Sequence, residues 1–395
     1  MMINYNKINF KKSSTLFISG QYPDGKFYII NKGKVIFESY FADNFKYEHK
    51  KGDIIGIVSA VMNEPYFSTS KVIEDTEVIE IDVREIEKID NVELMNKIYK
   101  HLINTMEVWV KKYYYFLYKY SKVDSSEKLN ITYICKSYID KGFLYAAIKI
   151  YENNQEKIND KNVVNKISKI EPIESPKEIT KGVFSFKKGS CLFEETSQNN
   201  YIYFVKSGIV GVYSYFNHKP VTRMKYYDND IFGYKDLLGK KVIANTAIVL
   251  EDSIIKIMDK KEFENMIIED KATRVYLIKM MSARVYNTIA RIKAININNV
   301  ILKILTVIEG LIKLDLMFKK TNYIALFYTI DDILSMVFID HTDYVEREIK
   351  KIKSIKITDE KNIVISNINN FFKEYQIYFK RNSDKINNED FGDDI

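Results

Sequence analysis

The first 85 residues show apolar and polar positions that alternate with period two. Stretches of this kind are KFYII, KVIFESYF and TEVIEID, and glycine or Asp/Asn turns separate them at intervals of about 8–12 residues. Short alternating strands at this spacing are typical of an all-β domain. The pattern therefore predicts a small antiparallel roll or barrel at the N-terminus.

The same plan recurs later in the chain. The stretch from Asp230 to Ile257 matches the stretch from Asp53 to Ile81, and a glycine turn, Gly56 or Gly233, lies near the start of each. Upstream, FYIINKGKV parallels IYFVKSGIV. Self-similarity of this kind indicates two copies of one module. We expect a second roll from about residue 170 to 258, with glycines at turns that need positive φ.

Helical periodicity follows each roll. After the first roll it runs from Val83 to about Tyr120, and residues 127–160 then form a helical hairpin with its turn at Lys141-Gly142. The segment YICKSYIDKGFLYAAIKIY resembles one tetratricopeptide-repeat unit, which cannot bury its apolar face alone. The hairpin is either a spacer between the rolls or a docking site for a protein partner. The polar stretch Lys157–Lys169 is interpreted as a linker between domains.

After the second roll, residues Ala272 to Ile297 place apolar side chains at steps of three and four: Ile278, Met281, Val285, Ile289, Ile292 and Ile295. A narrow seam of this kind packs well against a copy of itself, so the sequence predicts a dimerisation helix and a homodimer. Packing within one subunit is the alternative. A further apolar helix is expected from Asn299 to Leu316.

The last folded piece is expected from Thr329 to about Tyr375. TIDDILSMVF opens with a capping box, in which Thr329 is the cap and Asp332 takes the place of the usual Glu. A turn at Ile339-Asp340 leads into a second helix, HTDYVEREIKKIKSI, and KITDEKNIVIS reads as a β-hairpin. Helix, turn, helix and a two-stranded wing form a DNA-reading arrangement when the second helix carries suitable side chains.

These patterns divide the chain into six parts: the first roll with its helices (1–122), the helical hairpin (123–165), the second roll (166–259), the dimerisation and connecting helices (260–322), a winged helix-turn-helix (323–380), and an acidic tail expected to be disordered (381–395).

Composition limits the function without naming it. The chain has 395 residues, a formal charge of +7 and 46% hydrophobic residues, as in an ordinary soluble globular protein. Its two cysteines, Cys135 and Cys191, are too few for a cysteine-ligated iron–sulfur cluster. No signal peptide or membrane span is visible, so a cytoplasmic protein with no membrane contact is expected. The four histidines are too dispersed for a metal site, and no catalytic motif is present, so we do not expect an enzyme.

The paired stretches KKGDIIG and NDIFG, with the strand pairs VIEDTEVIEID and IVLEDSIIKI, resemble the cyclic-nucleotide-binding domain. From the second roll onward, TIDDILSMV and YVEREIKKIK resemble the two helices of a Crp/Fnr-type transcription regulator. The resemblance implies an α+β protein with two jelly-roll-like rolls in tandem, a dimerisation helix and a DNA-reading winged helix. It covers nearly the whole chain except residues 123–165, and the additional N-terminal roll is unusual for that family.

In the family, a Glu just after the turn glycine binds the ribose hydroxyl and an Arg about ten residues later pairs with the phosphate. These positions hold Ile57 and Tyr66 in the first roll, and Tyr234 and Ile243 in the second. Burying a phosphate without a cation is costly, so conventional cyclic AMP or cyclic GMP binding is not expected. No cofactor is assigned, and a cyclic nucleotide is left as an open alternative. Tyr66 and Tyr234 either fill the pocket or stack on another ligand. The candidate ligand-binding residues of these altered cassettes are Gly56, Tyr66, Thr69, Gly233, Tyr234, Asn245 and Thr246.

The resemblance also assigns the DNA-contacting residues. The family's base-contacting Arg–Glu pair falls on Thr342-Asp343, and its later Arg falls on Arg347, which is suited to guanine. Lys350 and Lys351 are suited to phosphates. Acidic residues on the same helix oppose DNA, so a winged helix kept for protein contacts is the alternative. On that alternative, the protein is a non-DNA-binding scaffold or signalling protein whose rolls and helical hairpin bind other proteins.

Overall fold

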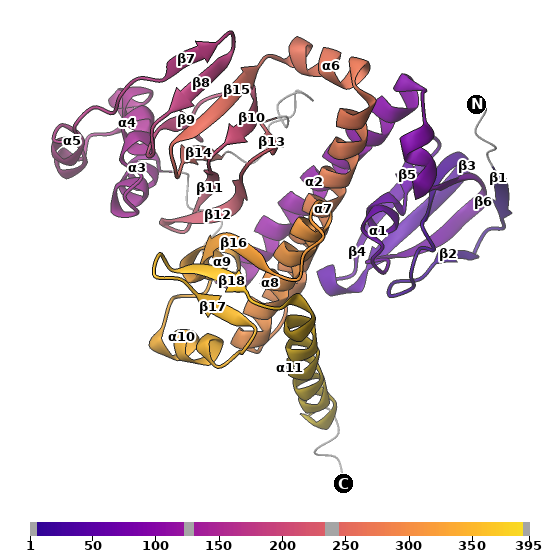
Figure 1. The fold of residues 1–395 in the computed structure, drawn as a ribbon. Helices are drawn as coiled ribbons and strands as arrows, with labels where there is room; N and C mark the ends of the chain where they lie inside the picture. The colour runs from indigo at the N-terminus through magenta and orange to yellow at the C-terminus, as the bar shows by residue number, and fades with distance from the viewer. Residues whose placement is uncertain (1–5, 122–129, 234–244, 390–395) are drawn as a thin grey trace. The chain divides into compact units, whose positions relative to one another are not determined.

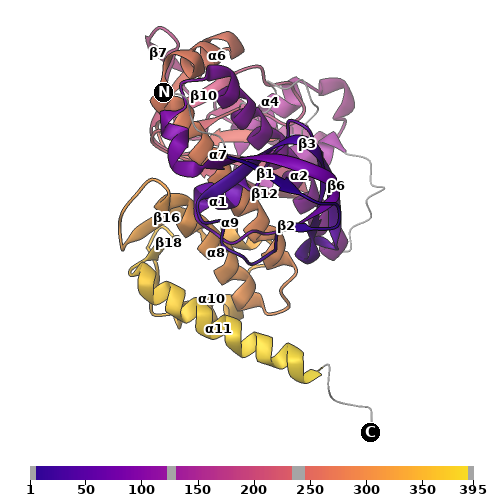
Figure 2. The same cartoon turned by 90° about the vertical axis from the view of Figure 1, so that its right-hand side faces the viewer.

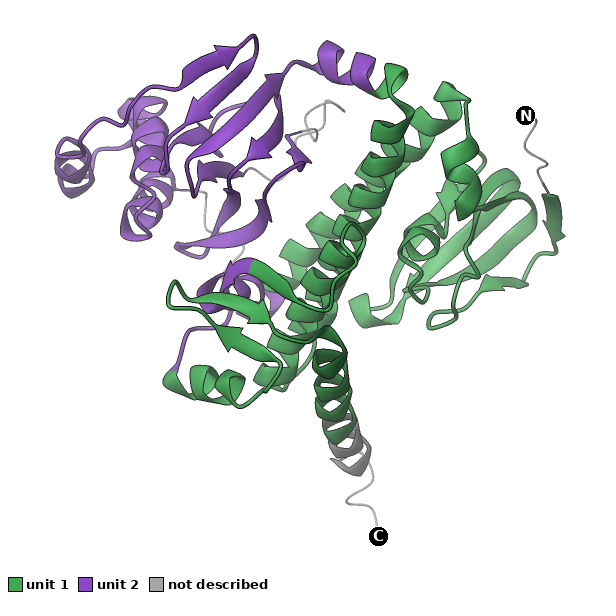
Figure 3. Cartoon of the chain, in the orientation of Figure 1, with its two compact units in different colours: residues 1–117, 267–326, 343–395 green, residues 118–266, 327–342 purple. Residues whose placement is uncertain are grey.

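The computed structural model describes residues 6–121, 130–233 and 245–389, with only the backbone given for 382–389. It divides into two compact units (Figure 3). Unit 1 contains residues 1–117, 267–326 and 343–395, and unit 2 contains residues 118–266 and 327–342. Candidate Tyr234 and position Ile243 lie outside the described residues.

The first roll is the predicted antiparallel sheet. Its path order is β1-β6-β3-β4, with β2 and β5 on the sides of β6 and β3. The strands are β1 (Asn6–Phe10), β2 (Thr15–Phe17), β3 (Lys26–Ser39), β4 (Phe45–Lys50), β5 (Ile54–Ile55) and β6 (Thr69–Asp82). Its helical elements are η1 (Tyr40–Ala42), α1 (Ile57–Met62), η2 (Val83–Lys88) and the long α2 (Val92–Ser121). The change from period two to helical period near residue 83 is thus confirmed.

The second roll consists of two sheets, in the orders β13-β10-β15-β8-β7 and β12-β11-β14-β9. Its strands are β7 (Lys177–Thr180), β8 (Val183–Phe186), β9 (Cys191–Phe193), β10 (Ile202–Ser207), β11 (Val210–Phe216), β12 (Lys219–Tyr226), β13 (Ile231–Phe232), β14 (Thr246–Val249) and β15 (Ser253–Met258). Apolar side chains of both sheets meet in one core that includes Val205, Val212, Val249 and Ile255.

The helical hairpin has its predicted turn, but it is not a separate spacer. It contains α3 (Ile131–Asp140), α4 (Leu144–Glu152), η3 (Gln155–Lys157) and α5 (Lys161–Ile167), so α5 crosses the expected boundary at residue 165. Its apolar residues share one core with Cys191, Tyr213 and Ile248 of the second roll. A lone hairpin leaves its apolar face uncovered, and here the neighbouring roll covers it.

The expected dimerisation helix is α7 (Lys271–Ile295), which follows α6 (Lys260–Glu269) and precedes α8 (Val300–Leu316). All six seam residues are 0–3% exposed within this single chain. In unit 1, α7 packs against α8 and α1, and Figures 1 and 2 both show α7 and α8 side by side. In the structure the seam is therefore buried by packing within one chain, which is the alternative that the sequence left open.

Partly buried ionic contacts reinforce this packing in unit 1. The ammonium of Lys313 on α8 lies 2.7 Å from Glu64, just beyond α1, and 2.5 Å from Glu309. Lys313 also donates to the hydroxyl of Tyr286 on α7 at 3.0 Å. Because charges that are largely removed from water need partners, these contacts pair the charges where the first roll meets the two helices.

The C-terminal part begins with β16 (Ile324–Thr329) and α9 (Ile330–Met336), which has the predicted capping box between Thr329 and Asp332. It continues with α10 (Asp343–Lys350), β17 (Ile355–Ile357), β18 (Asn362–Ile365) and α11 (Ile368–Glu389). The predicted hairpin is present, with Ile355 opposite Ile365, in a sheet of order β16-β18-β17.

The acidic tail was expected to be disordered from residue 381, but α11 continues through Glu389. Its N-terminal turn is fixed by the buried side chains of Ile368 and Phe371. Once a helix is nucleated, each further residue adds a hydrogen bond at little cost, so packing at one end supports the polar end. No helix in the described ranges is long and apolar enough to cross a membrane.

Candidate functional site

The turn at the end of β5 needs glycine. Gly56 has φ 79° and precedes α1, and a Cβ at this position would lie 3.1 Å from Cε1 of Tyr66. Positive φ and close approach both exclude larger side chains. Tyr66, which stands at the family's Arg position, is thus held directly against the turn.

The side chain of Tyr66 fills the interior of the first roll. Its ring stacks on Phe17 at a centroid distance of 3.9 Å, and only 5% of the residue is exposed. Its hydroxyl lies 3.4 Å from the carbonyl of Lys26, and burial, followed by nearby negative charge, raises the pKa of the phenol. The hydroxyl of buried Thr69 accepts from the backbone of Ser19 at 3.1 Å. Both candidate residues therefore have contacts within the roll.

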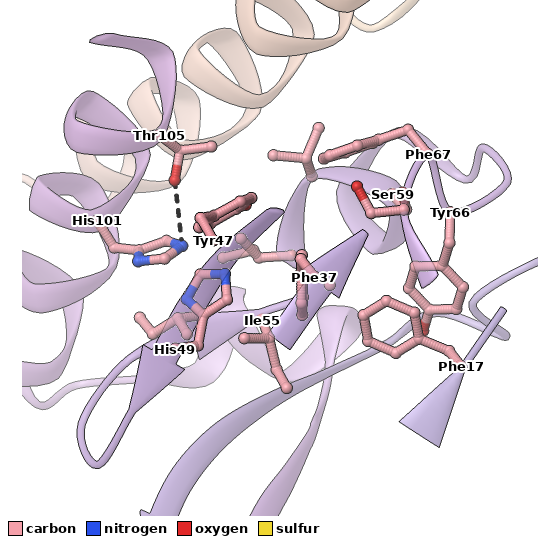
Figure 4. Close-up of a pocket in the computed structure, with 15 residues that line it drawn as sticks. Phe17, Phe37, Tyr47, His49, Ile55, Ser59, Tyr66, Phe67, His101 and Thr105 are labelled. Atoms are coloured by element: carbon pink, nitrogen blue, oxygen red, sulfur yellow. Dashed lines mark hydrogen bonds between the residues drawn. The ribbon is translucent and has the colours of Figure 1, made fainter. Parts of the chain in front are cut away.

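The remaining cavity beside Gly56 is about 20 Å³ (Figure 4). Its walls include the aromatic side chains of Phe17, Phe37, Tyr47 and Tyr66. This volume fits about one water molecule, whereas small-molecule sites occupy roughly 300–1,000 Å³. In this conformation the space beside Gly56 does not admit a nucleotide, because the roll's own aromatic residues occupy it.

The structure brings together two histidines that sequence reasoning treated as dispersed. The rings of His49 on β4 and His101 on α2 are 6.3 Å apart at the edge of this cavity (Figure 4). His49 Nδ1 lies 3.6 Å from Asp53, and a ring nitrogen of His101 lies 3.3 Å from the Thr105 hydroxyl. Burial lowers the pKa of His101 to about 4. Across the described residues, no group of three or more potential ligands could hold a metal ion.

Only part of the candidate ligand-binding cassette of the second roll lies within the described residues. Gly233 follows β13 with φ 90°, and a Cβ there would lie 2.5 Å from the carbonyl oxygen of Tyr201. Asn245 accepts from the hydroxyl of Ser214 at 2.8 Å. The buried hydroxyl of Thr246 accepts from the backbone of Glu195 at 3.2 Å. Both polar candidates thus have hydrogen bonds within unit 2.

Glu195 is a titratable group that sequence reasoning missed. Its carboxylate accepts from the Tyr138 hydroxyl on α3 at 2.6 Å and from the Tyr215 backbone at 3.2 Å. Burial raises the pKa of Glu195 to about 7, although these hydrogen bonds act in the opposite direction. No local pattern marks Glu195, because its partners lie 57 and 20 residues away.

The five candidate DNA-contacting residues are all exposed: Thr342, Asp343, Arg347, Lys350 and Lys351. The apolar side of α10 is formed by Val345 and Ile349, which are buried. Two of the candidates make ion pairs on the surface: Lys350 with Glu346 at 2.6 Å and Lys351 with Glu348 at 2.5 Å. Such exposed pairs contribute little to stability.

The fold and the turn geometry describe two roll domains whose glycine turns follow one plan, with one interior filled by aromatic residues. The family model described as cyclic nucleotide-binding domain matches residues 7–91 and 183–270. The chain therefore contains two copies of this domain.

Solved structures give weaker likenesses. A CooA variant from Carboxydothermus hydrogenoformans is 18% identical, with 49% of this chain and 87% of that chain covered and a TM-score of 0.39. The cAMP-bound PfPKA-R is 17% identical over 70% and 79% of the two chains, with a TM-score of 0.25. A protein kinase A regulatory subunit from Trypanosoma cruzi bound to guanosine is 14% identical over 70% and 77%, with a TM-score of 0.22. No curated protein sequence matches the chain.

Proposed function

We propose that this protein is a cytoplasmic, Crp/Fnr-like DNA-binding transcription regulator whose two roll domains act as sensor or interaction modules. The observation that carries the proposal is α10. It buries Val345 and Ile349, exposes the residues at the family's base-contacting positions, and is followed by the β17–β18 hairpin. An exposed helix followed by a wing has the form that reads a major groove.

The charge of α10 predicts selective but weak binding. Asp343, Glu346 and Glu348 offset the positive charge of Arg347 and Lys350. Base reading by Arg347 therefore has to supply much of the preference, because phosphate attraction depends on net cationic contacts. We expect binding whose sequence preference depends on Arg347 and whose affinity falls with increasing salt only through the few phosphate contacts that remain.

The two rolls take different parts in this proposal. The first roll is filled by its own aromatic residues, which favours an interaction or structural role over nucleotide sensing. By elimination, the second roll is the proposed sensor. Because the α7 seam is buried within the chain, a homodimer of this protein has to use another surface.

The test is retention of genomic DNA by the full chain at low salt, followed by gel-shift titration of a recovered site. Arg347→Ala is expected to relax base preference by about tenfold or more, as loss of one bidentate guanine contact does. Lys350→Ala is expected to weaken all sequences alike and to reduce the salt slope by about one. Arg84→Ala, an exposed arginine in η2 of the first roll, is the matched control. Absence of retained DNA even at low salt would rule out the proposal.

A further inference from the structure

Unit 1 contains a groove outside the interior of its roll. The groove has a volume of about 610 Å³, and its walls come from η2, from α7 and from the residues that follow α8. All of these segments belong to unit 1 (Figure 3). Small-molecule sites occupy roughly 300–1,000 Å³. The groove therefore has room for a small ligand, whereas the cavity beside Gly56, at about 20 Å³, does not.

The residue spacing along α7 builds one wall of this groove. Lys271, Val275 and Lys279 line the groove and follow one another at steps of four, so their side chains lie on one face of the helix. Two helical turns, about 12 Å, separate the two lysines along the helix axis. Val275 lies between them and is only 9% exposed. The wall thus has an apolar centre between two basic side chains.

Two aromatic rings border the same groove. Tyr276 on α7 and Phe318, which follows the end of α8, have ring centroids 5.0 Å apart at an angle of 46°. The side of Phe318 that does not face Tyr276 is accessible, since 39% of the residue is exposed. Aromatic rings attract one another at centroid distances of about 4.5–7 Å in offset or edge-to-face geometry. The pair therefore offers a contact surface to a further planar ring.

The basic side chains of the groove have weakly held partners. Lys279 pairs with Glu87 at 2.9 Å, and Lys271 pairs with Asp90 at 2.9 Å. The carboxylate side chains are 64% and 79% exposed, whereas the lysine side chains are 41% and 40% exposed. Exposed pairs of this kind contribute little free energy, so little opposes their replacement. An anionic group of a ligand in the groove would form charge-assisted hydrogen bonds with the same ammonium groups.

The start of α7 is held in place by contacts of its own. Arg274 is 7% exposed, and its guanidinium donates to the carbonyls of Ile267 at 2.7 Å and Ile268 at 2.6 Å, near the end of α6. The carboxylate of Asp270 caps the first turn of α7. A site that is ordered before the ligand arrives costs less free energy to occupy. The wall that carries the two lysines is therefore formed in advance.

We propose that this groove binds a small aromatic acid, that is, a planar ring that carries a carboxylate or a phosphate group. The ring packs against Phe318, Tyr276 and Val275, and the anionic group replaces Glu87 as the partner of Lys279. Tyr276 and Lys279 are three residues apart on α7, so both can contact one ligand of this size. The site is separate from the candidate cassettes of both rolls, and it does not rest on the proposed DNA binding.

Two fluorescent probes with the same ring system test the class of ligand on the full chain. Anilinonaphthalene sulfonate is an aromatic anion, and phenylnaphthylamine is its neutral counterpart without the sulfonate. The ratio of their affinities isolates the contribution of the anionic group. The sulfonate is expected to bind the wild type about tenfold more tightly, as a hydrogen bond to a charged group provides. Equal affinities of the two probes would overturn the proposal.

Charge variants test the role of the lysine. Lys279→Gln is expected to weaken the sulfonate about tenfold and to leave the neutral probe unchanged. Glu87→Gln removes the competing carboxylate and is expected to tighten the sulfonate alone, by about threefold. The control is Lys88→Gln, which removes an exposed pair with Glu85 in η2 and should change neither affinity. An equal response of both probes in Glu87→Gln would mean that the variant has loosened the fold, and the assignment to Lys279 would fail.

The aromatic wall has its own variant. Phe318→Ser is expected to weaken both probes about fivefold, because each loses a ring contact. Tyr22→Ser, which removes a 59% exposed ring of the first roll, is the control and should leave both affinities unchanged. The fluorescence of Trp109, the single tryptophan of the chain and fully buried on α2, checks that each variant is folded. Unchanged affinities in Phe318→Ser would place the probes elsewhere and overturn the proposal.

Competition then narrows the chemistry of the ligand. Benzoate and phenyl phosphate are titrated against the bound sulfonate probe, with phenol as the uncharged comparison. At least one of the two anions is expected to displace the probe, and the more effective one indicates whether the acid group is a carboxylate or a phosphate. Displacement by phenol to the same extent, or by none of the three, would overturn the aromatic-acid assignment. A failure of the chain to bind DNA would leave these results unchanged.

Discussion

Replacement of Glu195 by Gln should stabilise unit 2 at alkaline pH and leave it nearly unchanged in acid. Glu195 lies where α3 meets the second roll, and burial raises its pKa from 4.5 to about 7. The folded protein therefore keeps a proton on this carboxyl between these pH values, whereas the unfolded chain releases it. Stability contributed by the protonated carboxyl is fully present below pH 4.5 and is lost as the pH rises through about 7.

The magnitude follows from the shift. Each pKa unit corresponds to about 1.4 kcal/mol, so a shift from 4.5 to about 7 corresponds to about 3 kcal/mol. Glu195 retains partial solvent exposure, which reduces the expected effect to about 2 kcal/mol. Gln keeps an oxygen that can accept from Tyr138 and carries no charge, so the variant should not have this pH-dependent loss.

The assay is urea unfolding of the full chain at pH 5 and pH 8, with variant and wild type compared at each pH so that other titrations cancel. The difference should be small at pH 5 and about 2 kcal/mol in favour of the variant at pH 8. Glu152→Gln, an exposed position at the end of α4, is the control and should show no such difference. A difference that is independent of pH, or that favours the variant only in acid, would refute the reasoning.

Three further variants test the packing. Tyr66→Ala should destabilise the protein by about 3–5 kcal/mol in urea unfolding, as loss of a buried aromatic ring does; a neutral result would show that the ring does not hold the first roll together. Ile289→Ala should cost about 2–5 kcal/mol without changing the mass measured by light scattering, and a change in mass would instead place the seam at a subunit interface. Gly310→Val should lower the free energy of unfolding by about 1–3 kcal/mol, because a Cβ at Gly310 would lie 2.8 Å from that of Ala290; an unchanged unfolding midpoint would mean that α7 and α8 separate easily.

Local features were predictable from the sequence, because they depend on residues close together in the chain. The positive φ of Gly56 and Gly233, the capping box of Thr329 and Asp332, and the β17–β18 hairpin all follow from spacing within a few residues. Self-comparison of the two copies also identified the roll domain, since matched turns at matched intervals specify the same strand order.

Only the tertiary structure decided which surfaces meet. An apolar seam has the same sequence pattern whether a second subunit or the chain's own helices cover it. Here α1 and α8 cover it. Tyr66 and Phe17 stack, and His49 lies beside His101, through contacts between segments about 50 residues apart. Periodicity shows that a face must be buried, but not what buries it, because apolar burial is non-directional. The partners are selected by shape and by buried charge pairs such as Lys225 and Asp332, which exist only once the chain has folded.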